Sequence, residues 1–198
     1  YFENMVFETL TQYNFAKGGL GTKQFDLNKV TNGNFEAVQA GRVAESWQII
    51  NDTTIQFNIR KGLRYTFDPS NPASALAAGR EVTAQDMLFV CNRAVANTSL
   101  PLPGRDFIES WTAPDKYTLV LKMKSPLYSL WNDTVNRISG PYPPEVVTKY
   151  GNLKDWKNWV STGPFIMTDF VADSSATFKK NPAYWGTDEL HPENKIPY

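Results

Sequence analysis

Hydrophobic and polar positions alternate in several short stretches of the chain, which predicts β-strands. Between Trp47 and Arg60 the alternation is interrupted by Asn51-Asp52, a turn pair, so a β-hairpin is predicted whose second strand buries one face. The alternation from Tyr117 to Met123 predicts a half-exposed strand, and residues 165–171 and 176–180 are predicted as two more. Because these strands are interspersed with helical patterns, the fold class is α/β, with mixed α and β elements.

Helices are predicted from capping residues and from apolar residues at helical spacing. Thr83 followed by Asp86 is a capping-box pattern, and the helix that it begins should bury one stripe. This stripe consists of Met87, Val90, Cys91, Ala94 and Val95. Pro144 suits a first helical position and Gly151 suits the stop, so a second helix is predicted between them. Residues 1–10 also place apolar side chains at helical spacing.

Composition and charge narrow the classes of function. The 198 residues are 41% hydrophobic and 14% aromatic, which argues for a folded chain of one domain or two intergrown lobes. Lys and Arg number 20 and Asp and Glu number 20, so the formal net charge is zero and no nucleic-acid partner is expected. No apolar run approaches the roughly 20 residues that span a bilayer. The single cysteine, Cys91, lies on the predicted buried stripe and is interpreted as an inert core thiol.

Few residues suggest catalysis or metal binding. His191 is the only histidine, and its Leu-His-Pro context favours a solvated loop. One histidine and one cysteine do not provide the usual ligand set of a structural metal site. The sequence also lacks a G-x-S-x-G elbow, and Gly18 to Gly21 lack the context of a phosphate loop. We therefore expect no enzyme, no metal and no cofactor.

Six short motifs occur in an order that resembles one protein family. They are Val6-Phe7-Glu8-Thr9-Leu10, Val43-Ala44-Glu45-Ser46-Trp47, Phe57-Asn58-Ile59-Arg60-Lys61-Gly62-Leu63, Val82-Thr83-Ala84-Gln85-Asp86-Met87, Gly163-Pro164-Phe165, and Phe178-Lys179-Lys180-Asn181-Pro182-Ala183-Tyr184-Trp185. Each motif alone is weak, but together they extend over nearly the whole chain. Their order is similar to that in family 5 of the extracellular solute-binding proteins, the oligopeptide, dipeptide and nickel receptors of ABC importers.

The resemblance implies a periplasmic-binding-protein-like type II fold, of which this chain would be an N-terminal fragment cut at both ends. Residues 1–7 and 145–198 would form part of the first lobe (domain I), and residues 8–144 would form the small inserted domain (domain Ib). Whole receptors of this family capture solute by closing two lobes, and a membrane permease recognises the closed state. The implied location is the periplasm or the extracellular face of a bacterial membrane. There, a lipid anchor of a lipoprotein, or the permease, would provide the only membrane association.

The resemblance makes an oligopeptide the default solute, although nickel, sugars and other solutes also occur in the family. Seven residues are candidates for the ligand cleft: Arg105, Trp131, Arg137, Gly140, Tyr142, Thr162 and Gly163. An arginine can pair with an anionic ligand group and an aromatic ring can stack on a ligand, but surface arginines and core aromatics are the commoner cases. The alternative is a stand-alone carbohydrate-binding module with tryptophans and tyrosines on an exposed face.

Two segments depart from the family pattern. Ser161-Thr162-Gly163 stands where many members have Gly-Thr-Gly, and the second departure is longer. The family usually passes to the helix that begins at Thr83 by a short Asp-Gly turn, whereas here Asp68 and Gly79 are separated by a Pro-, Ser- and Ala-rich insertion. This composition predicts a loop. We expect the insertion to reshape a surface loop without changing the fold.

Overall fold

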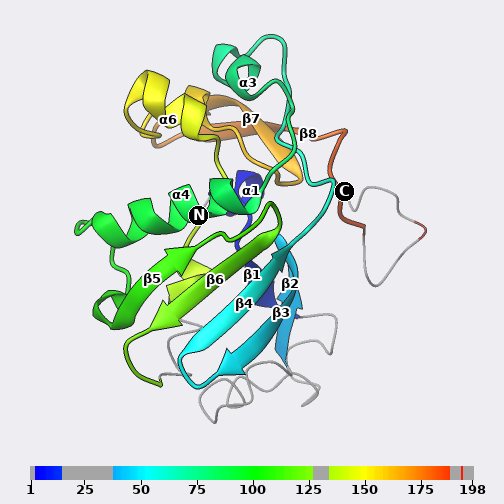
Figure 1. The fold of residues 1–198 in the computed structure, drawn as a ribbon. Helices are drawn as coiled ribbons and strands as arrows, with labels where there is room; N and C mark the ends of the chain where they lie inside the picture. The colour runs from blue at the N-terminus through cyan, green and yellow to red at the C-terminus, as the bar shows by residue number, and fades with distance from the viewer. Residues whose placement is uncertain (1–2, 15–37, 127–133, 188–192, 194–198) are drawn as a thin grey trace, which may run out of the picture. The chain divides into compact units, whose positions relative to one another are not determined.

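The computed structural model describes residues 3–14, 38–126, 134–187 and 193, which belong to two compact units (Figure 1). Unit 1 comprises Tyr1–Glu8, Lys61–Val82 and Gly140–Tyr198, and unit 2 comprises Thr9–Arg60 and Thr83–Ser139. The predicted mixed α and β composition is confirmed. Glu8 and residues 61–82 and 140–144 cluster with unit 1, and the expected division into first lobe and small domain stays a prediction.

Unit 2 is built on a four-stranded antiparallel sheet in the order β3-β4-β6-β5 (Figure 1). The strands are β3 (Ala44–Asn51), β4 (Thr54–Ile59), β5 (Ile108–Thr112) and β6 (Thr118–Met123). The predicted hairpin is confirmed as β3 and β4, and Ile55, Phe57 and Ile59 are buried because alternate residues of a strand point to the same face. Strand β5 was not predicted, since a register shift after Ile108 breaks its alternation.

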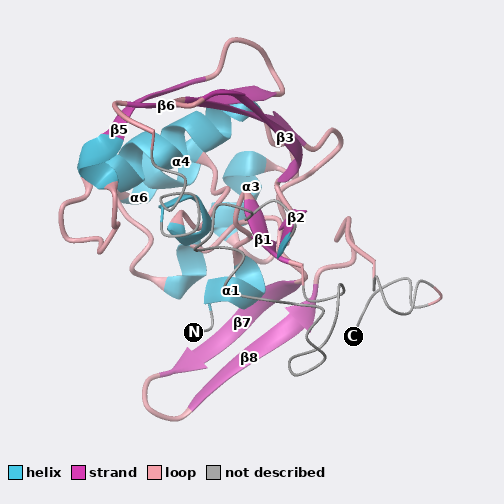
Figure 2. Cartoon of the chain, turned by 90° about the horizontal axis from the view of Figure 1, so that it is seen from below, coloured by secondary structure: helices cyan, strands magenta, loops and turns pink. Residues whose placement is uncertain are grey.

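Helix α4 (Ala84–Ala96) lies against one face of this sheet (Figures 1 and 2). The predicted capping box is present, and the backbone N–H of Thr83 donates to the carboxylate of Asp86 at 2.8 Å. The predicted stripe is confirmed for its buried members, which are Met87, Val90, Cys91 and Ala94, whereas Val95 is half-buried. Burial raises the pKa of the Cys91 thiol far above its ordinary value, so this cysteine is an inert core residue at neutral pH.

A small antiparallel pair, β1 (Thr11–Tyr13) and β2 (Gln39–Gly41), completes the described strands of unit 2. It is joined to the 3-10 turn η4 (Val135–Arg137) through the side chain of Asn136. The Thr11 hydroxyl donates to the Asn136 side-chain oxygen at 2.7 Å, and the Asn136 amide nitrogen donates to Gln39 at 3.3 Å. A second 3-10 turn, η3 (Arg105–Phe107), precedes β5.

Unit 1 combines short helices with the antiparallel hairpin of β7 and β8. Its elements are α1 (Glu3–Val6), α3 (Pro72–Ala77), α6 (Pro144–Tyr150), η5 (Trp156–Asn158), β7 (Phe165–Val171) and β8 (Ser175–Lys180). Helix α1 lies beside β7, and α3 contacts α6 and η5 (Figures 1 and 2). Helix α6 begins at Pro144 and ends at Tyr150, and Gly151 stops it as predicted, because Gly151 takes a positive φ of 80° that favours glycine.

The prediction of a loop between Asp68 and Gly79 is wrong, because this segment contains helix α3. The Asn71 side chain accepts hydrogen bonds from the backbone N–H groups of Ala73 and Ser74, at 2.8 and 3.2 Å. Pro72 occupies the first helical position, and Ala78 ends the helix with a positive φ of 47°. Asparagine and proline, which were interpreted as loop residues, are here the start signals of a helix.

Candidate functional site

Three of the motif-bearing segments meet at the side chain of Glu8 in unit 1. The Thr162 hydroxyl donates to Glu8 Oε2 at 2.6 Å, and the Trp185 indole N–H donates to the same oxygen at 3.0 Å. The Tyr184 hydroxyl donates to Glu8 Oε1 at 3.3 Å. We call Glu8, Thr162, Tyr184 and Trp185 the Glu8 cluster. It joins the segment after α1, the segment before β7 and the segment after β8.

The chemistry of the Glu8 cluster explains why a glutamate stands at this position. Glu8 is only 7% exposed, and a buried carboxylate is tolerated where hydrogen bonds replace its lost hydration. The hydroxyl groups and the indole N–H all donate toward it, so the central group must accept at both oxygens. An ionised carboxylate is acceptor-only, whereas a glutamine would turn an NH₂ group toward at least one of these donors.

Backbone contacts hold the same segments together. Gly163 donates from its backbone N–H to the carbonyl oxygen of Val6 at 3.0 Å, and its own carbonyl accepts from the Asn181 side chain at 2.9 Å. A β-carbon added at Gly163 would lie 2.3 Å from the Val6 oxygen, so the close approach requires glycine. Gly140 donates from its backbone N–H to the Glu8 carbonyl at 3.0 Å.

An aromatic group lies on the neighbouring residues of the same unit. Phe7 packs edge-on against Tyr142, with ring centroids 6.4 Å apart, and against Trp159, with centroids 5.6 Å apart. Tyr142 is 8% exposed, so most of its ring belongs to the core of unit 1 rather than to an open stacking surface. The Ser161 hydroxyl donates to the carbonyl oxygen of Pro141 at 2.6 Å and fixes the adjacent chain.

The candidate cleft residues fall into three groups in the structure. Those that lie in unit 1 are Gly140, Tyr142, Thr162 and Gly163. Arg105 is in unit 2, where its Nη2 donates to the backbone carbonyls of Asn97 at 2.6 Å and Leu100 at 2.7 Å and so closes the loop after α4. Arg137, the last residue of η4, is exposed in the same unit. Trp131 lies outside the described residues, as do His191, Gly18 to Gly21 and the terminal residues 194–198.

Sequence reasoning did not select the residues that surround Thr162 and Gly163. Those missed are Phe7, Glu8, Trp159, Asn181, Tyr184 and Trp185. All but Trp159 stand within the quoted motifs, which were used as family markers rather than as contacts. The signal that was available is the joint presence of an isolated glutamate and of donor side chains in separate motifs.

The described part of the chain offers no grouping of three or more His, Cys, Asp or Glu residues suited to a metal ion. Its helices are all too short or too polar to cross a membrane. The chemistry of the site is therefore hydrogen bonding, aromatic packing and one buried carboxylate.

Comparison with known proteins decides the family. The profile of the bacterial extracellular solute-binding proteins, family 5 Middle, matches residues 39–195, which is more than half of the chain. The chain belongs to this family. The resemblance carried by the six motifs is thereby confirmed, and the bacterial members of family 5 work outside the cytoplasm, in the periplasm or at the cell surface.

Individual relatives of this family 5 chain are distant and longer. It is 25% identical over 166 residues to the oligopeptide-binding protein AliA of Streptococcus pneumoniae, an alignment that covers 75% of this chain and 25% of AliA. DppA from Helicobacter pylori in complex with the peptide STSA superposes with a TM-score of 0.66 at 21% identity, over 92% of this chain and 35% of DppA. MoaA from A. tumefacien R10 in complex with mannopinic acid gives a TM-score of 0.67 at 18% identity, over 92% of this chain and 32% of MoaA.

These likenesses confirm the predicted periplasmic-binding-protein-like type II fold. The chain spans about a quarter to a third of the length of the proteins that it matches. It therefore corresponds to one portion of a larger architecture.

Proposed function

We propose that this chain is a portion of the extracellular substrate-binding receptor of a bacterial ABC importer, and that its solute is an oligopeptide. The observation that carries the proposal is the family match over residues 39–195. It is supported by three motif-bearing segments that meet at Glu8, because these segments then serve one structural purpose. The peptide assignment is supported by the relatives named as oligopeptide-binding proteins, such as AliA. MoaA, with mannopinic acid, shares the fold alone, and a fold does not fix the solute.

In the proposed receptor, residues 1–7 and 145–198 belong to the first lobe, residues 8–144 to the small domain, and the second lobe to sequence outside this chain. Within the range 8–144, residues 61–82 cluster with unit 1, so we assign them to the first lobe in place of the small domain. The lobes close over the solute, and a membrane permease recognises the closed form. The receptor works in the periplasm or on the outer face of the membrane, and a lipid anchor or the permease holds it there.

The candidate cleft residues receive two kinds of role. Thr162 and Gly163 are buried and held by hydrogen bonds within unit 1, so their proposed role is to fix the chain beside the solute, while the arginines Arg105 and Arg137 provide positive charge. No covalent chemistry is required, since capture and release are binding steps. The receptor is not an enzyme.

The test is isothermal titration of the full-length receptor with peptide pools, beside the 198-residue chain alone. Because affinity arises from enclosing the solute between lobes, we expect micromolar or tighter binding by the full-length protein, and binding by the chain alone at least about 100-fold weaker. Matched titrations with oligosaccharides and Ni²⁺ define the solute class. A full-length receptor that binds either of these and no peptide overturns the assignment, and micromolar peptide binding by the chain alone overturns the two-lobe requirement.

The alternative of a stand-alone carbohydrate-binding module requires tryptophans on an exposed face. The tryptophans that the structure describes are Trp47, Trp111, Trp156, Trp159 and Trp185, and each of these is buried or half-buried. The described residues therefore give this alternative no specific support. Titration of the chain alone with polysaccharide, together with fluorescence quenching of the tryptophans, tests it directly.

A further inference from the structure

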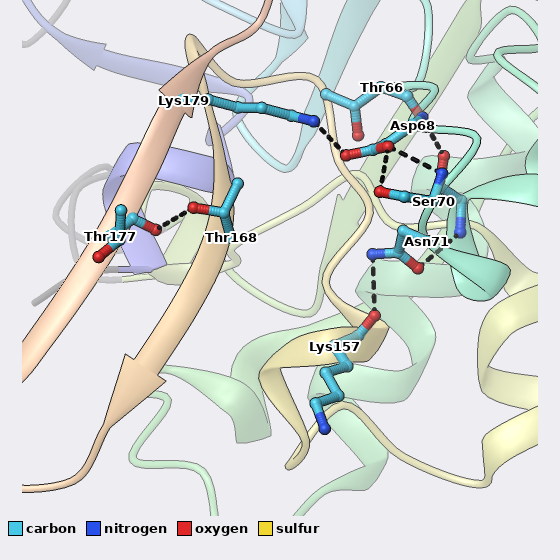
Figure 3. Close-up of polar contacts among 9 residues, drawn as sticks. Thr66, Asp68, Ser70, Asn71, Lys157, Thr168, Thr177 and Lys179 are labelled. Carbon is cyan, nitrogen blue, oxygen red and sulfur yellow. Dashed lines mark hydrogen bonds and ion pairs between the residues drawn. The ribbon is translucent and has the colours of Figure 1, made fainter.

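The segment between Asp68 and Gly79, interpreted from the sequence as an insertion, is tied together with Thr66 to three other segments of unit 1, two of which Figure 3 shows. Two of these contacts come from its own residues and one from Thr66 beside it. The partners lie on β8, on η5 and at Ser161, the residue before Thr162. If this segment were only an added surface loop, we would expect its hydrogen bonds to stay within the loop.

Asp68 makes the first contact. Its Oδ1 accepts hydrogen bonds from the backbone N–H and the hydroxyl of Ser70, at 3.0 and 2.7 Å, and its Oδ2 forms an ion pair with the ammonium group of Lys179 on β8. Figure 3 shows the extended Lys179 side chain reaching across to Asp68. The Asp68 side chain is 11% exposed, whereas that of Lys179 is 48% exposed. The hydrogen bond from Lys179, followed by those from Ser70, lowers the pKa of Asp68 to about 2, so the carboxylate stays charged at neutral pH.

Asn71 and Thr66 make the other two contacts. While Asn71 Oδ1 caps α3, its Nδ2 donates to the carbonyl oxygen of Lys157 in η5 at 3.0 Å (Figure 3). The backbone N–H of Thr66 donates to the Ser161 carbonyl at 2.8 Å. Ser74 connects these points within the insertion, because its hydroxyl accepts from the Asp68 N–H at 2.7 Å and donates to the Thr66 carbonyl at 3.2 Å.

We propose that the Asp68–Gly79 insertion is a clamp that fixes the position of residues 161–163, and that the Asp68–Lys179 ion pair keeps the clamp closed. The clamp orders this segment before any solute arrives. Binding then does not include the loss of conformational entropy that ordering the segment would require. The structural part of the proposal stands on the contacts alone. Its consequence for solute affinity rests on the proposed function, because it requires that Thr162 and Gly163 lie at the solute site.

The structural part is tested by hydrogen exchange on the 198-residue chain and its variants Asp68→Asn, Lys179→Met and the double variant, with Lys180→Met as the control. Lys180 is the next residue on β8 and its side chain points to the opposite face of the strand. We expect the Thr66 amide to exchange about two- to fivefold faster in both single variants, with no further rise in the double variant, as for a pair worth up to about 1 kcal/mol.

Amides of β4 in unit 2 should keep their exchange rates, as should Thr66 in Lys180→Met. An unchanged Thr66 rate in both single variants, or an equal acceleration in β4, overturns the clamp. If Asp68→Asn does not fold, Asn71→Ser replaces it, because serine keeps the helix cap and removes the bond to the Lys157 carbonyl.

The consequence for the solute is tested by titrating the full-length receptor with a peptide that the parent protein binds. Lys179→Met should weaken affinity about two- to fivefold relative to Lys180→Met. Equal affinities with altered exchange at Thr66 overturn the link between clamp and site. A parent receptor that binds no peptide overturns the proposed function, while the exchange result still decides the clamp.

Discussion

Replacing Thr162 with valine removes the shortest described hydrogen bond to the Glu8 carboxylate and little else. Thr162 is 1% exposed, and its hydroxyl lies 2.6 Å from Glu8 Oε2. Valine keeps the branched shape, so no sizeable cavity forms. A buried hydrogen bond to a charged acceptor contributes about 1.5–3 kcal/mol to stability, and losing it leaves part of the carboxylate unsolvated. Because Tyr184 and Trp185 still donate to Glu8, we expect the free energy of unfolding to fall by about 2 kcal/mol.

The assay is urea unfolding followed by tryptophan fluorescence, since Trp159 and Trp185 belong to the same unit as Glu8. The matched control is Thr168→Val on β7, where the hydroxyl donates to the Thr177 carbonyl at 3.2 Å in an exposed position (Figure 3). The control should change the free energy of unfolding by less than about 0.5 kcal/mol. If both variants lose the same stability, the Glu8 cluster does not stabilise unit 1 in the manner described.

Three further predictions concern single positions. Gly163→Ala should lower the free energy of unfolding, measured in urea, by more than about 2 kcal/mol, because the new β-carbon meets the Val6 oxygen. Its control, Gly62→Ala, lies in open space at φ 75° and should lower it by about 1 kcal/mol, and similar losses in the two variants would contradict the close approach. Asp68 has a folded pKa of about 2, below its ordinary 3.8, so its ion pair adds stability above pH 4 that is lost as pH falls through about 2. Since the lysine partner is half-exposed, the free energies of unfolding of the parent protein and Asp68→Asn should differ by about 1 kcal/mol at pH 6 and converge near pH 2. A difference that does not change with pH would argue against the ion pair. Cys91 should resist thiol reagents until the protein unfolds, and rapid labelling of native protein would contradict its burial.

Elements determined by local sequence were predictable, and contacts between distant segments were not. The alternation in β4 and the capped stripe of α4 follow from spacing within single elements. Helix α3 was missed because Asn71-Pro72 occurs in loops as well as at helix starts, and only the contacts of the folded chain separate the two cases. The Glu8 hydrogen bonds join residues 154 to 177 positions apart, so no periodicity reports them.

The order of synthesis gives the wide separation of the Glu8 partners a further consequence. The strands of the four-stranded sheet lie between residues 44 and 123, so all of them are synthesised before Thr162. Glu8 must keep its charge hydrated by water until Thr162, Tyr184 and Trp185 emerge, because a lone carboxylate is costly to bury. A chain truncated after Pro164 would therefore retain every strand of this sheet but would lack both Tyr184 and Trp185 as donors to Glu8.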